Sequence, residues 1–377
     1  MTVRDLYLRG LKGRQLIERE LAGRDTYDRP LRRRLWLWRH GFLSESDYVY
    51  DLDDGNHRQY LTDVERFVRT PRINGEWNVA LSNKLVFHWL LSQFERHRVP
   101  VYGMVRDGTF LPLDDIEQSR TEAVAGIADG GETELRNTNA DAGAEVRALL
   151  EAEGKLVLKW IKGGGGENVF LCSRTDDGYV VNGVHKTDSE FDSLVNDLHE
   201  YLITAFVEQS AFSSSVYPDT TNTIRLLTMY DDTEGEAFIP IVILRAGTDR
   251  SAPMDNFGQG GISVEIDRET GALGEAVQLR NETELSRHAT HPSTNRQLDG
   301  VTLPGWPTIR DRMLEIAEAN RQLPYVGWDL VPTDDRGAFK ILEGNSYPGM
   351  KSLQCHRPLL AEDRVRAFYR RHGVLQR

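Results

Sequence analysis

Strand-like segments dominate the second half of the chain, and their spacing constrains the fold more than any other feature. Four of them follow one another with short connections, and two more come after a helix-like segment: ITAFVEQS, TIRLLTMY, AFIPIVILRAG and GISVEID, then YVGWDLVPT and GAFKILEGN after IRDRMLEIAEANRQL. Strands joined by short connections pair antiparallel, because a parallel pair needs a long crossover. The pattern predicts an α+β fold whose second half is a largely antiparallel sheet.

Helical spacing of apolar residues dominates the first 70 residues, and helices and strands alternate after them. One amphipathic helix is predicted from Asn78 to Pro100 and another over FDSLVNDLHEYL, residues 191–202. The acidic segment 114–143, rich in Gly, Asn and Thr, is typical of a surface loop.

The length of 377 residues is large for a single core, so more than one subdomain is expected. We predict a basic helical extension at 1–75, a first subdomain at 76–203 and a second subdomain at 204–377.

Charge is distributed unevenly along the chain. The net charge is −12, but residues 1–40 carry +6, which leaves −18 for the remainder. The basic part includes RPLRRRLWLWRHGF, from Arg29 to Phe42. One interpretation is a patch for an anionic membrane face or a polyanionic partner; the other is a helix whose Leu and Trp side chains pack while its arginines meet the acidic body. The acidic remainder argues against nucleic-acid binding.

A soluble, cytoplasmic protein is expected from the absence of targeting features. The first 25 residues carry charges throughout, unlike a secretory signal, and no segment approaches the roughly 20 apolar residues of a membrane span. The two cysteines, Cys172 and Cys355, are expected to be buried free thiols.

Four consecutive glycines, Gly163 to Gly166, follow a strand-like segment and are flanked by Lys159 and Lys162. No Gly-Lys-Ser/Thr follows them, and they do not open a helix as GxGxxG does. A glycine-rich hairpin can present backbone N–H groups to nucleotide phosphates, with the lysines supplying positive charge. A flexible hairpin without a ligand remains the alternative.

Three oxygen-bearing side chains lie near the ends of the last two predicted strands. Glu343 and Asn345 are two residues apart and therefore share a strand face, and a hairpin would bring Asp329 beside them. Two carboxylates and an amide oxygen suit Mg²⁺. Ordinary polar residues at strand ends are the alternative, but the apolar neighbours favour a partnered, partly buried site.

The order of these segments resembles the ATP-grasp superfamily from about Asn78 to His356. The likeness is closest to the sugar-transfer-associated branch, in LWLWRHGF, NTIRLLT, DNFGQGGISVEID and GWDLVPTDDRGAFKILEGN, and DNFGQGG also resembles a segment of glutamate ligases. Asn83 and Trp160 depart from the Asp and Pro that the superfamily usually has.

The resemblance implies two α+β subdomains that clasp ATP, and it assigns roles residue by residue. The implied set comprises the phosphate-binding residues Lys84, Lys159, Lys162, Gly163, Gly164, Gly165 and Gly166; Phe206, Val207 and Glu208 at the adenine or ribose; Arg225, Arg245 and Asn256 near phosphate or substrate; and the metal ligands Asp329, Glu343 and Asn345.

The implied activity is an ATP- and Mg²⁺-dependent ligase, with Mn²⁺ as an alternative ion, that joins a carboxylate to an amine through an acyl phosphate and releases ADP. The branch implies a setting in surface-polysaccharide or glycoconjugate biosynthesis. Its small-molecule or glycan-linked substrates are not identified, and a glycosyltransferase or membrane surface could contact the basic N-terminal helices. A phosphotransferase and a non-catalytic ATP-binding partner of a glycosyltransferase are the alternatives.

For five other polar residues the sequence indicates only general roles. Gln354 and His356 are expected either to bind the acceptor or to cap and pack a helix. His185, His288 and His291 lack metal-ligand spacing and are expected at the surface.

Overall fold

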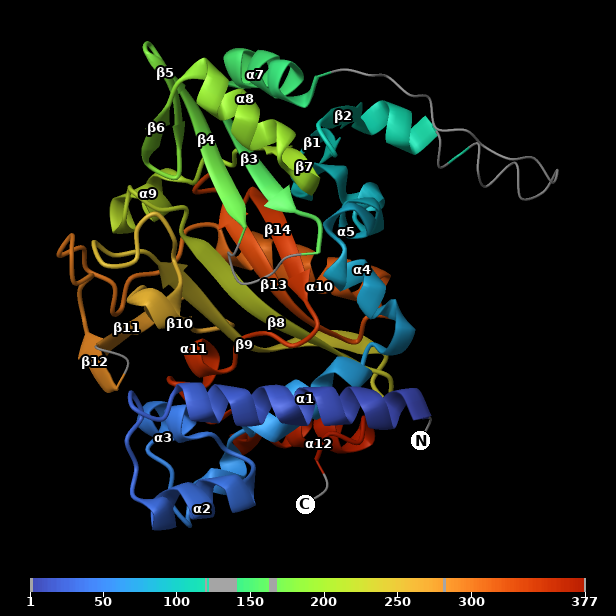
Figure 1. The fold of residues 1–377 in the computed structure, drawn as a ribbon. Coiled ribbons are helices and arrows are strands. Elements are labelled where there is room, and N and C mark those ends of the chain that lie inside the picture. The colour runs from blue at the N-terminus through green and yellow to red at the C-terminus, as the bar shows by residue number, and fades with distance from the viewer. Residues whose placement is uncertain (1–2, 119–120, 122–140, 163–167, 281–282, 376–377) are drawn as a thin grey trace. The chain divides into compact units, whose positions relative to one another are not determined.

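A computed structural model describes residues 3–118, 121, 141–162, 168–280 and 283–375 (Figure 1). Within these ranges, side chains are described from residue 12 onward except at Arg280. The described chain forms two compact units: residues 82–208, here called the inserted unit, and residues 1–81 with 209–377, called the composite unit. Most of the loop predicted at 114–143, and all four glycines from Gly163 to Gly166, lie outside the described residues. The predicted three-part division into 1–75, 76–203 and 204–377 stays a prediction.

The inserted unit is built on a seven-stranded antiparallel sheet in the order β2-β1-β7-β3-β4-β5-β6. Its strands are β1 (Val101–Arg106), β2 (Thr109–Pro112), β3 (Lys155–Trp160), β4 (Val169–Thr175), β5 (Gly178–Val181), β6 (Val184–Lys186) and β7 (His199–Ala205). Its helices include α5 (Lys84–Leu90), η5 (Ser92–His97), α7 (Ala142–Glu153) and α8 (Asp188–Asn196).

Alternation along β3 explains how this sheet is covered. Leu156 and Leu158 are fully buried in a core that α7 and α8 complete with residues such as Val146 and Phe191 (Figure 1). Side chains of successive strand residues point to opposite faces, so Lys159 lies on the other face of the sheet.

The composite unit contains a second seven-stranded antiparallel sheet, in the order β12-β11-β10-β9-β8-β13-β14. Its strands are β8 (Thr223–Asp231), β9 (Glu236–Ala246), β10 (Ile262–Ile266), β11 (Leu273–Arg280), β12 (Glu284–His288), β13 (Tyr325–Pro332) and β14 (Phe339–Asn345). Its α-helices are α1 (Val3–Ala22), α2 (Leu31–His40), α3 (Ser44–Tyr50), α4 (Val79–Ser82), α9 (Ala211–Val216), α10 (Trp306–Ala319), α11 (Lys351–Gln354) and α12 (Asp363–Arg371). Short 3₁₀ or π segments are η1 (His57–Gln59), η2 (Glu65–Arg69), η3 (Thr70–Arg72), η4 (Gly75–Asn78), η6 (Phe257–Gln259) and η7 (Leu359–Ala361).

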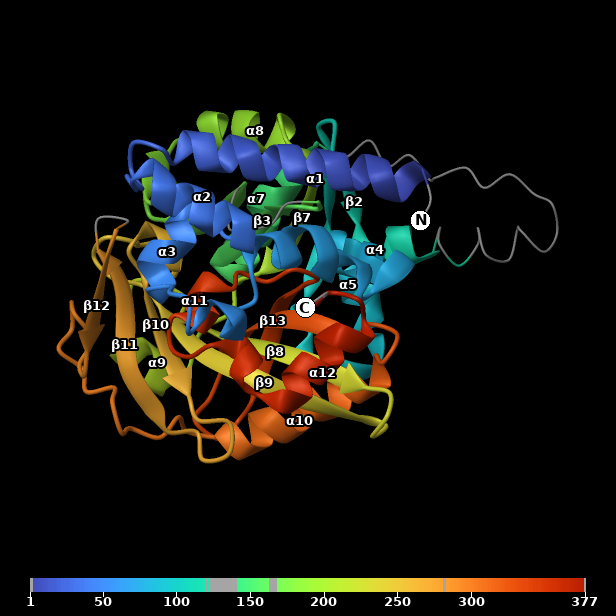
Figure 2. The ribbon, with the colours of Figure 1, turned by 90° about the horizontal axis from the view of Figure 1, so that it is seen from below.

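One face of this sheet is divided between a core and a polar region. Leu227 and Ile243 are fully buried against α12 residues such as Phe368, and α12 crosses β8, β9 and β13 in Figure 2. Arg225 is two residues before Leu227 on β8 and therefore points to the same face. The apolar core thus ends where the charged residues begin.

Buried ion pairs link the N-terminal helices to one another. Arg34 Nη2 lies 3.1 Å from Glu20 Oε1, which joins α2 to α1, and Arg33 binds the buried Asp47 of α3 (Figure 2). Arg33 thus meets the acidic part of the chain and Leu37 is fully buried, as the packed-helix interpretation expects. Leu31, Leu35 and Trp38 are exposed, which that interpretation did not expect. None of the helices that the structure describes has the length and apolarity needed to cross a bilayer.

Two predicted elements are wrong in their extent. The helix predicted from Asn78 to Pro100 is interrupted at Asn83, because that residue has extended backbone angles and its side chain accepts the N–H groups of Leu85 and Val86 as the N-cap of α5. The helix predicted over 191–202 ends at Asn196.

The residues after that helix end form β7 instead. Leu202 and Ile203 are buried on opposite faces of the sheet, and β7 is paired with both β1 and β3. The strand predicted from Ile203 onward therefore starts earlier and ends at Ala205.

Candidate functional site

Charged side chains from four strands meet on the polar part of the composite sheet. Asp329 of β13 lies directly opposite Arg225 of β8 and opposite Glu343 of β14, so these three form a row across adjacent strands. Arg245 of β9 lies opposite Thr223 of β8, which is two residues before Arg225. Antiparallel register places directly opposed side chains on the same face, which is why residues more than a hundred positions apart in sequence meet here.

Two arginines and two aspartates form the centre, here called the arginine–carboxylate cluster: Arg225, Arg245, Asp255 and Asp329. Arg225 donates from Nε to Asp329 Oδ1 and from Nη2 to Oδ2, both at 2.5 Å. Arg245 Nη2 lies 2.5 Å from Asp255 Oδ1, and its Nη1 lies 3.6 Å from Asp329 Oδ2. Bidentate pairing fixes the orientation of Arg225 as well as its charge.

The cluster is largely removed from solvent, which strengthens its electrostatics. Asp329 is 5% exposed, and the side chains of Arg225 and Arg245 are 13% and 14% exposed. Burial by itself would raise the pKa of Asp329, but the charges of Arg225 and Arg245 outweigh it and lower that pKa below its ordinary value of 3.8. Asp329 is therefore ionised at neutral pH.

Glu343 and Asn345 extend the cluster with further oxygen atoms. Asn345 Nδ2 donates to Glu343 Oε1 at 3.2 Å, which leaves Asn345 Oδ1 as an acceptor. In the described parts of the chain, no three His, Cys, Asp or Glu side chains form a group that could hold a metal ion. A metal site here would need the Asn345 amide, and the hard oxygens of Asp329, Glu343 and Asn345 are the donor type that Mg²⁺ prefers. The donor types fit this ion chemically, while both Asp329 oxygens accept hydrogen bonds from Arg225 in this structure.

Asp255 was not among the predicted site residues, although it completes the cluster. Its Oδ2 accepts the hydroxyl of Thr223 while its Oδ1 binds Arg245. The available signal was its position directly before the predicted Asn256 in DNFGQGG, ten residues after Arg245, which lies in an apolar strand and needs a partner there.

Asn256 shapes the loop that carries Asp255. Its Oδ1 accepts the Gly258 N–H at 3.0 Å, and its carbonyl accepts the Gly261 N–H. Gly260 has a φ of +100°, and a Cβ on Gly261 would lie 2.9 Å from the Asp255 carbonyl oxygen. The tight turn therefore requires glycines at these two positions.

In the inserted unit, the end of β3 meets the start of α5. The Lys84 N–H donates to the Ile161 carbonyl at 3.0 Å, which places Lys84 beside the segment between Lys159 and Lys162. Lys162 is paired with Glu200 at 3.1 Å. Three predicted phosphate-binding lysines thus lie near the point where Gly163 begins the undescribed segment.

The predicted adenine-binding residues follow the end of β7. Phe206, Val207 and Glu208 lie after Ala205 rather than within a strand. Lys155 contacts two of them, because its Nζ lies 2.7 Å from Glu208 Oε1 and 4.9 Å from the centre of the Phe206 ring. Lys155 and Lys159 are at opposite ends of β3, roughly 13 Å apart at the rise of a strand.

Gln354 has a structural role, which favours packing over acceptor binding. It is 1% exposed; its Oε1 accepts the Leu61 N–H at 2.8 Å and its Nε2 donates to the Leu61 carbonyl at 3.1 Å. These bonds attach the N-terminal segment to α11 within the composite unit.

Two histidines are also structural. His356 Nε2 lies 2.7 Å from Ser263 Oγ, and burial together with the charges of Arg287 and Arg357 lowers its pKa to about 3. The expectation that His291 lies at the surface is wrong: it is fully buried, and its Nε2 bonds the Gly247 carbonyl at 2.8 Å.

His356 is expected to make the free energy of unfolding fall as the pH drops below its ordinary pKa of 6.5. The unfolded chain then binds a proton that the folded protein excludes until about pH 3. Each pH unit between these values costs about 1.4 kcal/mol. Urea unfolding midpoints of wild type and His356→Gln, measured between neutral pH and about pH 5, should show a shallower decline in the variant. Parallel declines would contradict a buried neutral His356.

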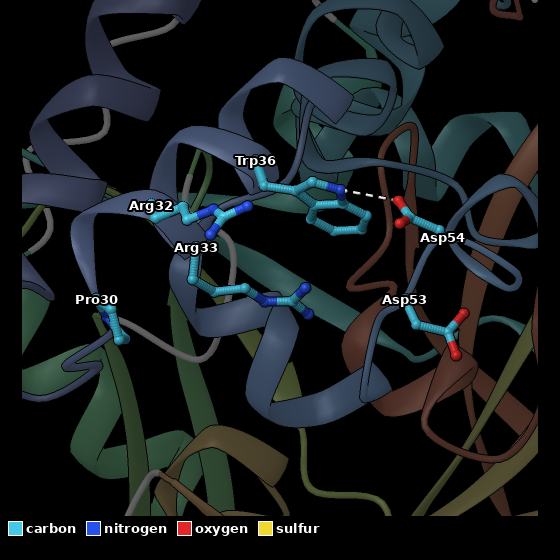
Figure 3. Close-up of a pocket in the computed structure, with 6 residues that line it drawn as sticks. All are labelled: Pro30, Arg32, Arg33, Trp36, Asp53 and Asp54. Carbon is cyan, nitrogen blue, oxygen red and sulfur yellow. Dashed lines mark hydrogen bonds between the residues drawn. The ribbon is translucent and has the colours of Figure 1, made fainter.

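A surface pocket of about 410 Å³ lies on the N-terminal helices, and none of the predicted site residues is among its lining. Its lining consists of Pro30, Arg32, Arg33, Trp36, Asp53 and Asp54 (Figure 3). Trp36 Nε1 donates to Asp54 Oδ1 at 3.0 Å, and Arg33 is occupied by Asp47 and the Leu52 carbonyl. The polar groups of this pocket are therefore largely satisfied within the protein.

Comparison with known proteins gives one family match. The family model described as sugar-transfer associated ATP-grasp matches residues 80–365. No curated protein matches the chain.

Several solved structures match part of the chain. An ADP complex of N5-carboxyaminoimidazole ribonucleotide synthetase is 12% identical with a TM-score of 0.36, covering 72% of this chain and 46% of that one. The D-alanine-D-alanine ligase from Coxiella burnetii is 10% identical with a TM-score of 0.36, covering 81% and 60%. The L-amino acid ligase from Bacillus licheniformis is 11% identical with a TM-score of 0.34, covering 72% and 42%. The chain thus spans between 42% and 60% of the length of these three proteins.

Proposed function

The chain belongs to the sugar-transfer associated ATP-grasp family, and from this membership we propose that it is an ATP- and Mg²⁺-dependent ligase that joins a carboxylate to an amine. The reaction would proceed through an acyl phosphate and release ADP and phosphate. We place it in surface-polysaccharide or glycoconjugate biosynthesis, where the substrates would be small or glycan-linked acids and amines. A glycosyltransferase or membrane surface would contact the basic N-terminal helices.

The observation that carries the proposal is the arginine–carboxylate cluster beside Glu343 and Asn345. Two guanidiniums and three oxygen-bearing side chains share one sheet face. The arginines and Asp329 are largely buried, and Glu343 and Asn345 are half-buried. Phosphoryl transfer from ATP needs both charge types, because the phosphates are anionic and their metal ion is cationic. With Glu343, three carboxylates face two guanidiniums, a formal excess of one negative charge that a bound cation would balance.

Roles follow for the residues of each unit. We assign the phosphates of ATP to Lys84, Lys159, Lys162 and the four glycines Gly163, Gly164, Gly165 and Gly166; adenine or ribose to Phe206, Val207 and Glu208; and substrate or phosphate to Arg225, Arg245 and Asn256. The lysines neutralise the triphosphate, and the glycines allow backbone N–H groups to approach it.

Asp329, Glu343 and Asn345 would hold Mg²⁺, or Mn²⁺ in its place, which neutralises phosphate charge when bound. A carboxylate oxygen of the substrate attacks the γ-phosphorus, and the bond from that phosphorus to the oxygen of the leaving ADP breaks. The amine nitrogen then attacks the acyl carbon, phosphate leaves with the electrons of the C–O bond, and the nitrogen loses a proton. Arg225 and Arg245 would stabilise the charge that builds up on the transferred group.

ATP with Mg²⁺ is expected to raise the thermal unfolding midpoint of the protein more than either ligand alone. A ligand at 100 times its Kd stabilises the native state by about 2.7 kcal/mol. ADP release should then increase when an acid and an amine are supplied together, and mass spectrometry should detect the amide.

The other outcomes separate the alternatives. ADP release with an acid alone and a stable phosphorylated product would indicate a phosphotransferase. Nucleotide binding without ADP release across acid and amine panels would indicate a non-catalytic module. No stabilisation by Mg²⁺ and ATP would contradict the nucleotide site.

A further inference from the structure

Helix α2 exposes a row of large apolar side chains. Leu31, Leu35 and Trp38 are 68%, 54% and 44% exposed. Their spacing of four and three residues places them on one face of the helix, while Leu37 on another face is fully buried. The helix therefore has two apolar faces, and only one of them contributes to the core.

Helix α1 adds a second exposed row next to the first. Ile17 and Leu21, four residues apart, are 63% and 58% exposed. Between them along the helix lies Glu20, whose partner Arg34 is also 5.3 Å from the ring centre of Trp38. Five of the nine large exposed apolar residues in the described parts of the chain thus belong to these two helices. Such clustering is typical of an interaction surface rather than of scattered surface residues.

Exposed positive charge borders the α2 row. Arg32 and Arg39 are exposed and make no ion pair among the described residues, whereas Arg33 and Arg34 are bound to Asp47 and Glu20. The first 40 residues carry a net charge of +6, and the remainder carries −18. An anionic surface would therefore attract this segment and repel the rest of the chain, which favours one orientation of the protein.

We propose that the α1–α2 face, defined as Ile17, Leu21, Leu31, Leu35 and Trp38 with Arg32 and Arg39, docks the protein on an anionic lipid surface. The apolar row would enter the boundary between headgroups and acyl chains, where tryptophan is favoured, and the two arginines would meet lipid phosphates. Lipid satisfies both requirements at once, since it offers hydrocarbon next to phosphate. The contact extends the partner part of the proposed function but does not depend on ligase activity.

Flotation of the full-length chain with vesicles, in the absence of nucleotide, tests the docking. Wild type should bind vesicles of phosphatidylglycerol and phosphatidylcholine, bind phosphatidylcholine alone much more weakly, and lose binding as salt is raised. Each basic residue near an anionic surface strengthens binding about fivefold. The Arg32→Glu/Arg39→Glu variant should therefore bind at least about tenfold more weakly, and Trp38→Ala should also bind more weakly.

The matched controls make the same types of substitution at exposed positions outside the α1–α2 face. Arg96→Glu/Arg296→Glu changes the net charge by the same amount at two exposed arginines elsewhere, and Trp77→Ala removes a tryptophan that is 55% exposed. Both controls should bind like wild type, and all variants should keep the wild-type thermal midpoint.

A second measurement locates the contact. Brominated lipids should quench tryptophan fluorescence in wild type on binding, and less so in Trp38→Phe. The proposal is wrong if wild type does not bind the anionic vesicles, if phosphatidylcholine alone binds equally well, or if the α2 variants bind like their controls. Concentration-dependent self-association that the same variants abolish would instead identify a second copy of the chain as the occupant. Because no ATP is present, failure here leaves the ligase proposal intact.

Discussion

Glu343→Gln is expected to abolish the Mg²⁺-dependent part of nucleotide binding and to lower turnover by at least about 100-fold. The substitution keeps the shape of the side chain and an oxygen that can accept the Asn345 Nδ2–H bond. It removes one of the two carboxylate charges proposed to hold the metal ion next to Asp329. Thermal unfolding with ATP, with and without Mg²⁺, measures the binding part, and ADP release measures turnover.

Glu265→Gln is the matched control for this substitution. Glu265 lies on β10 in the same composite sheet, where it pairs with Arg357 at 2.5 Å and its side chain is 29% exposed. Its loss should leave the Mg²⁺-dependent shift unchanged. A Glu343→Gln protein that responds to Mg²⁺ and ATP like wild type would falsify the metal assignment while leaving the lysines as nucleotide contacts.

Short-range patterns predicted the strands around this site well. β13 and β14 were readable because their apolar residues surround Asp329 and Glu343, and the hairpin between them gives the register that sets the two carboxylates opposite each other. The α+β ATP-grasp fold with N-terminal helices and the sugar-transfer associated family are likewise confirmed. The strands follow from periodicity in short windows, which a single sequence displays directly. The family resemblance follows from the order of the segments between Asn78 and His356.

Element ends and burial were harder to predict because they depend on competing local and distant contacts. Asn83 ends one helical segment and caps the next, a role that apolar periodicity does not reveal. Helix α8 ends at Asn196 because the following segment is recruited into the sheet between β1 and β3. His291 has no sequence signal for burial, since its partner is the Gly247 carbonyl 44 positions away.

The partners of the buried arginines could not be assigned from the sequence either. The resemblance placed Arg225 and Arg245 near phosphate or substrate, but a buried guanidinium is satisfied equally well by a carboxylate. The choice of Asp329 and Asp255 follows from the strand order β9-β8-β13 and from the loop after β9, which long-range pairing decides. Removal of Arg225 would leave the buried Asp329 carboxylate without the two hydrogen bonds that Arg225 donates to it.

Arg225→Met is expected to lower the free energy of unfolding by about 3–5 kcal/mol, because it leaves the Asp329 carboxylate buried without its bidentate partner. Arg245 at 3.6 Å would compensate in part, so the lower end of this range is the firmer expectation. Adding Asp329→Asn should restore much of the loss, since the remaining buried group is then uncharged. Urea unfolding midpoints of the two single variants and the double variant provide the test.

Acid should reduce the difference between wild type and Arg225→Met. In wild type the lowered pKa of Asp329 contributes stability that is present above 3.8 and is lost as the pH falls through the still lower folded value. Without Arg225, burial raises that pKa, so the variant takes up a proton at higher pH and its buried charge disappears. Arg312→Met is the control, because its pair with Glu315 is exposed and should change stability by less than about 1 kcal/mol at any pH. If Arg225→Met were no more destabilising than this control, Asp329 would have another counter-charge, and the cluster would not be the electrostatic centre that the ligase proposal requires.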